Sequence, residues 1–262
     1  MFYPKGYIMI TRRIKLVLHY DGTAYHGWQK QPAVPTIQGK IEQAIEKLCG
    51  VAVGVIGSSR TDAGVHALGQ VAHFDIDSPI PTKNFTSALN NLLPNDIAVV
   101  QAEQVPDDFD AISSTQSKWY RYTLCTASIR PVQRIRYCWH RPAPLDSEAM
   151  NQAAARLVGT HDFKSFASAA DTRESSIRTV LQCAVSAQSD DIFIDVSATG
   201  FLYNMVRNIV GTLVEIGRGR WRPEDIDRIL AAKDRAAAGP IAPAAGLCLM
   251  NVHYRRAPDR NL

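Results

Sequence analysis

The chain has 262 residues, of which 46% are hydrophobic and 21% charged, and its formal net charge is +4. These values are ordinary for a globular protein of one large or two smaller domains, and the slight basic excess permits an anionic partner without requiring one. The five cysteines are scattered without a CxxC pair, which argues against a disulfide framework or a zinc site. No apolar run has membrane-spanning length and the first residues lack a signal-peptide pattern, so we expect a soluble, cytoplasmic protein with no membrane association.

The first part of the chain alternates strand-like and helix-like segments. A helix is predicted from Ile37, because Thr36 is a suitable N-cap and Gly50 a suitable end for apolar residues at helical spacing. A second helix is predicted between a cap at Thr82 and a breaker at Pro94. Segments rich in β-formers, which indicate strands, are 14–20, 51–56, 70–76 and 97–105. The predicted order is β-α-β-β-α-β, that of a ferredoxin-like unit.

The second part of the chain repeats this order. A helix is predicted from a cap at Asp146 to a stop at Gly159, and a long helix from about Phe201 to Ile216 is followed by a short one from Pro223. The predicted strands are 118–126, 179–188, 191–199 and 247–254.

We therefore predict an α+β fold of two ferredoxin-like halves that face each other across a central cleft. The predicted boundaries are an N-terminal extension over 1–13, a first domain over 14–110 and a second domain over 111–262.

Candidate chemistry begins in the loop 57–69, GSSRTDAGVHALG, which places Asp62 two residues after Arg60 among small side chains. Taken alone, the stretch is a turn in which the aspartate bonds backbone amides and Gly64 takes a positive φ. A short motif of this kind needs support from the rest of the chain.

Support comes from the long helix, which is apolar on nearly all sides and carries Arg207 in the middle of its predicted range. A guanidinium in such a position is costly unless a carboxylate or phosphate meets it, although its long stem can also reach solvent. We favour a partner, and a loop aspartate that faces the cleft is the natural candidate.

Two further segments combine cations with aromatic rings. Alternation along KWYRYTL places Lys118, Tyr120 and Tyr122 on one face of a strand, where the rings either pack in a half-buried layer or stack on a base. The segment 130–141, RPVQRIRYCWHR, is either a solvated connection or a surface for RNA. Further cations that could join a basic rim are Arg12, Arg13, Arg173, Arg178, Arg218, Arg220 and Arg222.

The sequence contains no P-loop, no GxGxxG turn that opens a helix and no histidine pair at metal-ligand spacing. We therefore expect neither a metal nor a cofactor, so that a reaction would depend on one carboxylate, a tyrosine and arginine.

Taken together, these segments resemble the tRNA pseudouridine synthase A (TruA) family. The resemblance is carried by RTDxGVH, KxYxY and FLxxMVRxxVG in that order, and it extends over about residues 14–254. It implies two ferredoxin-like domains around a cleft and the isomerisation of uridine to pseudouridine without a cofactor. It also implies a homodimer with tRNA lying across both subunits, and modification of uridines at tRNA positions 38, 39 and 40 in the anticodon stem-loop.

The resemblance implies a role for each matching residue. Asp62 takes the place of the catalytic aspartate, and Tyr120 that of the tyrosine against the target uracil. Arg60 resembles the arginine that helps to displace the base, and Arg207 resembles the basic partner of the aspartate. Ser59 departs from the family, which usually has glycine immediately before the arginine; serine fits there if the backbone angle is permissive.

Two other functions would use some of the same residues. An RNA or nucleoside glycosidase also needs a carboxylate near C1′, but it would release free uracil, and such enzymes commonly use two carboxylates whereas this loop offers one. A non-catalytic ferredoxin-like RNA-binding module would use exposed aromatic rings, but it gives no role to the RTD loop or to a buried arginine.

Overall fold

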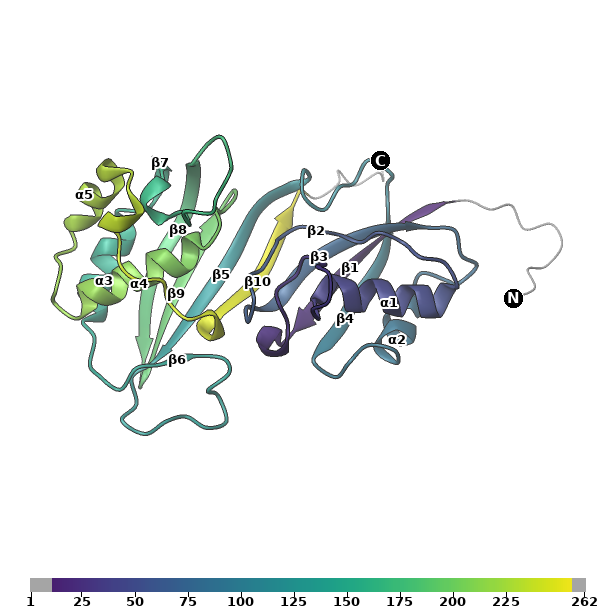
Figure 1. Cartoon of the computed structure of the whole chain (residues 1–262), viewed down its shortest axis with the longest axis horizontal. Coiled ribbons are helices and arrows are strands. Elements are labelled where there is room, and N and C mark those ends of the chain that lie inside the picture. The colour runs from purple at the N-terminus through teal and green to yellow at the C-terminus, as the bar shows by residue number, and fades with distance from the viewer. Residues whose placement is uncertain (1–10, 256–262) are drawn as a thin grey trace, which may run out of the picture.

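The computed structural model describes residues 11–255, which form an α+β molecule elongated along one axis (Figure 1). Most of the predicted extension over 1–13 lies outside the described residues, and its last two residues, Arg12 and Arg13, belong to the first strand. Within 11–255 no helix has the length and apolar content that crossing a membrane requires.

The first half has the strand order of a ferredoxin-like unit. Its elements are β1 (Arg12–Tyr20), α1 (Ile37–Cys49), β2 (Ile56–Gly57), β3 (His66–Ile76), α2 (Asn84–Asn90) and β4 (Ile97–Val105). Strand β1 pairs antiparallel with β3 and β4, and β2 pairs antiparallel with β3, so the order across the sheet is β4-β1-β3-β2.

The second half repeats that order. Its elements are β5 (Thr115–Cys125), β6 (Trp139–His140), α3 (Ser147–Ala155), β7 (Gly159–Asp162), β8 (Ile177–Gln188), β9 (Asp191–Ala198), α4 (Met205–Gly217), α5 (Asp225–Ala232) and β10 (Leu247–Tyr254). Strand β5 lies antiparallel between β10 and β9, and β8 pairs antiparallel with β9, which gives β10-β5-β9-β8. The short strands β6 and β7, which the sequence pattern did not predict, add to β5 and to the outer edge at β8.

The two halves are joined edge to edge. Strands β3 and β10 pair in parallel, with His66 opposite Cys248 and Ala67 opposite Leu249, so that all ten strands form one sheet. Figure 1 shows the halves side by side, with β5 and β10 between their helices. Because side chains alternate along a strand, Leu18, Tyr120 and Leu249 reach the same buried layer, and the core of both halves is one hydrophobic cluster.

The strand predicted over 51–56 is wrong for most of its length, since β2 contains only Ile56 and Gly57. The backbone of Val55 bonds to side chains of α1 instead of to β3: its N–H donates to Glu42 Oε1 at 3.2 Å, and its carbonyl accepts from Gln38 Nε2 at 2.9 Å. Gly54, just before it, weakens a strand further.

The predicted helix ends are confirmed for α1 and corrected elsewhere. The Thr36 hydroxyl accepts from the Gly39 N–H, and Gly50 ends α1 in the left-handed region at φ 75°. Thr82 does not cap α2, which begins at Asn84; its hydroxyl accepts instead from Arg12. Helix α3 begins after Asp146 as predicted but ends at Ala155, before the predicted stop at Gly159.

Candidate active site

The loop that follows β2 is held rigidly on both sides of one exposed residue. Ser58, Ser59 and Thr61 are buried, whereas Arg60 between them is exposed. The Gln70 side chain on β3 accepts from the Ser59 N–H at 3.2 Å and donates to the Ser59 carbonyl at 2.6 Å. Because the neighbouring backbone is fixed, the loop presents Arg60 outward and delivers Asp62 at a defined place.

Asp62 meets Arg207 from the other half of the molecule. Arg207 Nη1 lies 3.3 Å from Asp62 Oδ2, and each side chain is 16% exposed. The guanidinium is oriented by two further acceptors, the Ala242 carbonyl at 2.8 Å and Asn204 Oδ1 at 3.2 Å. The expected carboxylate partner of the buried arginine is therefore Asp62.

The position of Arg207 in its helix differs from the prediction. Helix α4 begins at Met205, so Arg207 lies in its first turn and not in its middle. Asn204 before it adopts a left-handed conformation at φ 61°, which ends any helical continuation from Phe201. The arginine thus projects from the start of α4 toward the loop after β2.

Burial has the larger effect on Asp62. It raises the pKa of the Asp62 carboxyl above the ordinary aspartate value, and the positive charge and hydrogen bond of Arg207 oppose that rise. Arg207 favours the ionised carboxylate as expected, but the net direction of the pKa shift is upward.

Tyr120 lies against the same loop. Its hydroxyl is 2.6 Å from Ser59 Oγ, and its ring meets the ring of Phe201 edge-on with centroids 5.1 Å apart. Burial raises the pKa of Tyr120, so the phenol is protonated at neutral pH. Ser59 is not among the residues with positive φ, so the backbone at this position does not require glycine.

Arg60 is brought to the same region without being fixed by the protein. Among residues 11–255 no hydrogen bond or ion pair engages its side chain. The structure thus brings Asp62, Arg207 and Tyr120 together and leaves Arg60 exposed beside them.

Lys118 is a residue of this region that the sequence reasoning placed on the Tyr120 face but gave no role. Its ammonium group donates to the Ser58 carbonyl at 2.5 Å. Burial, and to a smaller extent Arg173, lower the pKa of Lys118 to about 8. No carboxylate among residues 11–255 forms an ion pair with Lys118, so its ammonium group is suited to bind an anion. Period-two alternation had already placed Lys118 beside Tyr120.

The segment 130–141 uses part of its aromatic surface inside the protein. The Tyr137 hydroxyl donates to Asp21 at 2.9 Å, and Trp139 packs edge-on against Tyr122. Arg134 pairs with Asp191 at 2.5 Å. These contacts attach the segment to both halves and leave fewer free rings for bases than its composition suggests.

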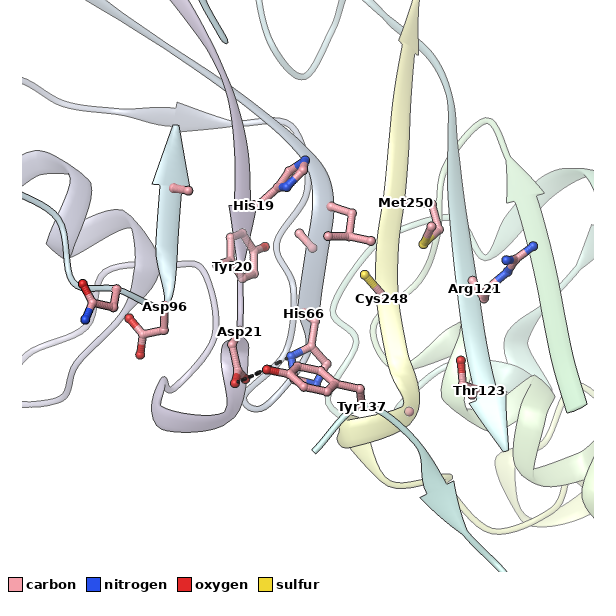
Figure 2. A pocket seen from close by; sticks show the side chains of 15 residues that line it. His19, Tyr20, Asp21, His66, Asp96, Arg121, Thr123, Tyr137, Cys248 and Met250 are labelled. Carbon is pink, nitrogen blue, oxygen red and sulfur yellow. Dashed lines mark hydrogen bonds and ion pairs between the residues drawn. The ribbon is translucent and has the colours of Figure 1, made fainter. Parts of the chain in front are cut away.

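A cavity of about 650 Å³ lies elsewhere, on the sheet face opposite Tyr120. In Figure 2, Asp21, His66 and Tyr137 lie close together in the middle of the residues that line it, with Asp96 on one side and Arg121 and Thr123 on the other. None of the four predicted site residues lines this cavity. In the part of the chain that the structure describes, no group of three or more His, Cys, Asp or Glu side chains could hold a metal ion.

Comparison with known proteins identifies the family to which the chain belongs. The family model described as tRNA pseudouridine synthase matches residues 16–112 and 153–255. A protein named tRNA pseudouridine synthase A 2 from Clostridium perfringens is 46% identical over 243 residues, which cover 93% of this chain and 100% of that protein. A protein named tRNA pseudouridine synthase A from Moorella thermoacetica is 49% identical over 243 residues. These residues cover 92% of this chain and 99% of that protein.

These matches define the class of protein: the chain is an isomerase that makes pseudouridine. It belongs to the tRNA pseudouridine synthase family, and the relatives it matches over nearly its whole length carry the name tRNA pseudouridine synthase A.

Proposed function

We propose that this protein converts uridine to pseudouridine in the anticodon stem-loop of tRNA, at positions 38, 39 and 40, with Asp62 as the reactive carboxylate and without a cofactor. We further propose that it works in the cytoplasm as a homodimer, and that its two functional domains divide between residues 110 and 111. The names of the relatives support tRNA as the substrate.

One observation supports the assignment of Asp62 above the others. Asp62 is a largely buried carboxylate, and its partner Arg207 lies 145 residues further along the chain, on helix α4 of the second half. Removing two such charges from water is costly, and a carboxylate with a single basic partner beside an exposed arginine is an arrangement suited to reaction.

The reaction fits the residues available. The C1′–N1 glycosidic bond of uridine breaks, the uracil turns, and a C5–C1′ bond forms. The C5 proton leaves and N1 takes up a proton, so the product is an isomer of the substrate. Nothing is oxidised and no group is imported. The ionised Asp62 begins the reaction by attack at uracil C6, by attack at C1′ or as a base at C2′, and Arg207 maintains the charged form.

The target nucleotide must first leave the helical stack, because its reacting atoms are inaccessible inside a stem. Arg60 is exposed beside Asp62 and is free to occupy the vacated space. The Tyr120 ring, held by its neighbours, packs against the extruded base.

A cluster of cations beside the tyrosine supports an RNA ligand. Arg173 donates to the Phe201 carbonyl at 2.5 Å, and the Arg178 guanidinium donates to the carbonyls of Ser175 and Ile177. Burial is the main cause of the lowered pKa of Lys118 and of Arg178, and repulsion by Arg173 lowers both further. The phosphate backbone of RNA would relieve that repulsion.

The decisive experiment is tritium release from tRNA that carries 5-tritiated uridine, with free uracil measured in the same reactions. We expect release by the wild-type protein without free uracil, and no release by Asp62→Asn, which keeps the size of the side chain but cannot be ionised. Asp108→Asn, a change at an exposed aspartate, is the matched control and should release tritium like the wild type.

The other outcomes point to the other functions. Free uracil would indicate a glycosidase, a reaction that commonly uses two carboxylates, whereas the partner of Asp62 is a guanidinium. Intact tRNA binding without tritium release by the wild type would indicate a binding module. Equal release by Asp62→Asn and the wild type would remove Asp62 from the reaction.

A further inference from the structure

The hydroxyl group of Ser59, in the loop after β2, lies against the hydroxyl group of Tyr120 on β5. Ser59 Oγ and the Tyr120 hydroxyl are 2.6 Å apart, and both residues are buried, at 7% and 6% exposure. A hydroxyl pair of this length is a full hydrogen bond in either direction of donation.

Both ends of this bond are fixed from outside. On one side, the Gln70 amide binds the backbone N–H and carbonyl of Ser59, and Gln70 is itself completely buried. On the other side, the Tyr120 ring is restrained by its strand and by the edge-on ring of Phe201. The hydrogen bond therefore joins two rigid parts and leaves the phenol little freedom to rotate.

The bond also crosses between the halves at the same place as the proposed reactive pair. Ser59 comes from the loop after β2 and Tyr120 from β5, just as Asp62 comes from that loop and Arg207 from α4. A shift of Tyr120 relative to the loop would change its position relative to Asp62, three residues beyond Ser59.

We infer that Ser59 is a positioning residue of this enzyme, which holds the Tyr120 hydroxyl so that the tyrosine meets the target uracil through its ring at a fixed place beside Asp62. The inference rests on the function proposed above. It assigns to the serine hydroxyl a task that a glycine at this position cannot perform.

The electrostatics agree with this geometry. Burial is the main cause of the raised pKa of Tyr120, and the hydrogen bond from Ser59 acts in the opposite direction. Without the Ser59 hydroxyl, the phenol would be a buried polar group that has lost a partner, and the ring would have to move to find another.

The test is a double-mutant cycle read by tritium release. We expect Ser59→Ala to lower kcat about tenfold with little change in the KM for tRNA, because a neutral hydrogen bond is lost and the ring is displaced. Ser59→Thr keeps the hydroxyl and should restore most of the rate. In a Tyr120→Phe background, Ser59→Ala should have no further effect, because the group it positions is already gone.

Ser58→Ala is the matched control, since Ser58 is an equally buried neighbour whose hydroxyl bonds to Thr115 and not to Tyr120. The inference is overturned if Ser59→Ala lowers kcat by the same factor with and without the Tyr120 hydroxyl, if Ser58→Ala has an equal effect, or if Ser59→Ala changes only KM. If Ser59→Ala does not fold, Ser59→Gly removes the same hydroxyl and enters the same cycle.

The outcomes separate this inference from the proposed function. Wild-type kinetics for Ser59→Ala, together with an inactive Asp62→Asn, would remove the role of Ser59 alone. An active Asp62→Asn would instead contradict the proposed function, whatever Ser59 does.

Discussion

The two halves of the molecule share one strand order but differ at the second strand. In the second half, β8 has 12 residues and runs into β9 through a tight hairpin at Ser189 and Asp190. In the first half, β2 has two residues, and the chain then forms the loop that carries Arg60 and Asp62 before β3 begins.

The short β2 explains why the candidate active site lies where the two halves meet. A full second strand in the first half would cover the edge of β3 and draw the loop residues into a ladder. With β2 so short, β10 pairs with the exposed part of β3 and brings α4 and β5 of the second half against the loop. The junction and the site therefore depend on the same shortened strand.

The strongest way to break this arrangement is to separate β3 from β10. A Cβ added at Gly69 would lie 2.3 Å from the Met250 carbonyl oxygen, so Gly69→Ala must push β10 away. We expect a loss of about 1–3 kcal/mol in the free energy of unfolding. A displacement of about 1 Å between Asp62 and Arg207 would also lower the rate about 100-fold.

Chemical denaturation and tritium release measure these two losses. Gly54→Ala is the control, because nothing lies within 4 Å of the added methyl group and the backbone there is not left-handed. Wild-type stability and activity for Gly69→Ala would contradict the view that the junction builds the site.

The next test removes the cross-half partner of Asp62. Burial already raises the pKa of Asp62 and Arg207 opposes this, so Arg207→Gln should raise that pKa further. Since the ionised form reacts, the acid limb of the pH profile of kcat/KM should move to higher pH, and activity should recover as the pH rises.

Arg218→Gln is the matched control, because it removes a positive charge at the other end of α4, where Arg218 pairs with Glu215. It should leave the acid limb of the pH profile of kcat/KM in place. A uniform fall in rate at every pH for Arg207→Gln would show that Arg207 acts by some means other than the ionisation of Asp62.

A smaller effect is expected at the cation cluster on the second half. Lys118→Met should reduce the slope of log Kd for tRNA against log salt by about 1, because one phosphate contact is lost. The pKa of Lys118 is about 8 and a bound phosphate would raise it, so wild-type affinity should fall as the pH rises through that value. Lys118→Met should abolish this pH dependence.

Lys47→Met, at the exposed end of α1, serves as the control for the loss of a lysine. An unchanged salt slope in Lys118→Met would exclude Lys118 from the RNA surface.

The smallest expected effects test whether the corresponding helices of the two halves are alike. Thr36 and Asp146 each accept a hydrogen bond from the third residue beyond them, at the starts of α1 and α3. Thr36→Ala and Asp146→Ala should each cost about 1 kcal/mol of stability. Lys83→Ala, at the exposed residue before α2, removes no side-chain cap and should stay within about 0.5 kcal/mol of the wild type in urea denaturation.

Local pattern predicted much of the fold. The caps at Thr36 and Asp146, the end at Gly50, and the bounds of β4 all follow from spacing along the chain. The failures have a common cause: at Val55 and Thr82, backbone or side-chain groups found distant partners that local propensity does not register.

The candidate site was predicted as residue types and not as contacts. The sequence by itself determined that an aspartate lies in a small-residue loop, that an apolar helix carries an arginine, and that two similar units follow one another, because these depend on neighbours along the chain. Only the tertiary structure decided that β3 joins β10, that Asp62 meets Arg207, that Ser59 bonds to Tyr120 and that Lys118 donates to the backbone of the same loop. Such contacts depend on which strand edges are free and which polar groups lose water together, and neither is written in local spacing.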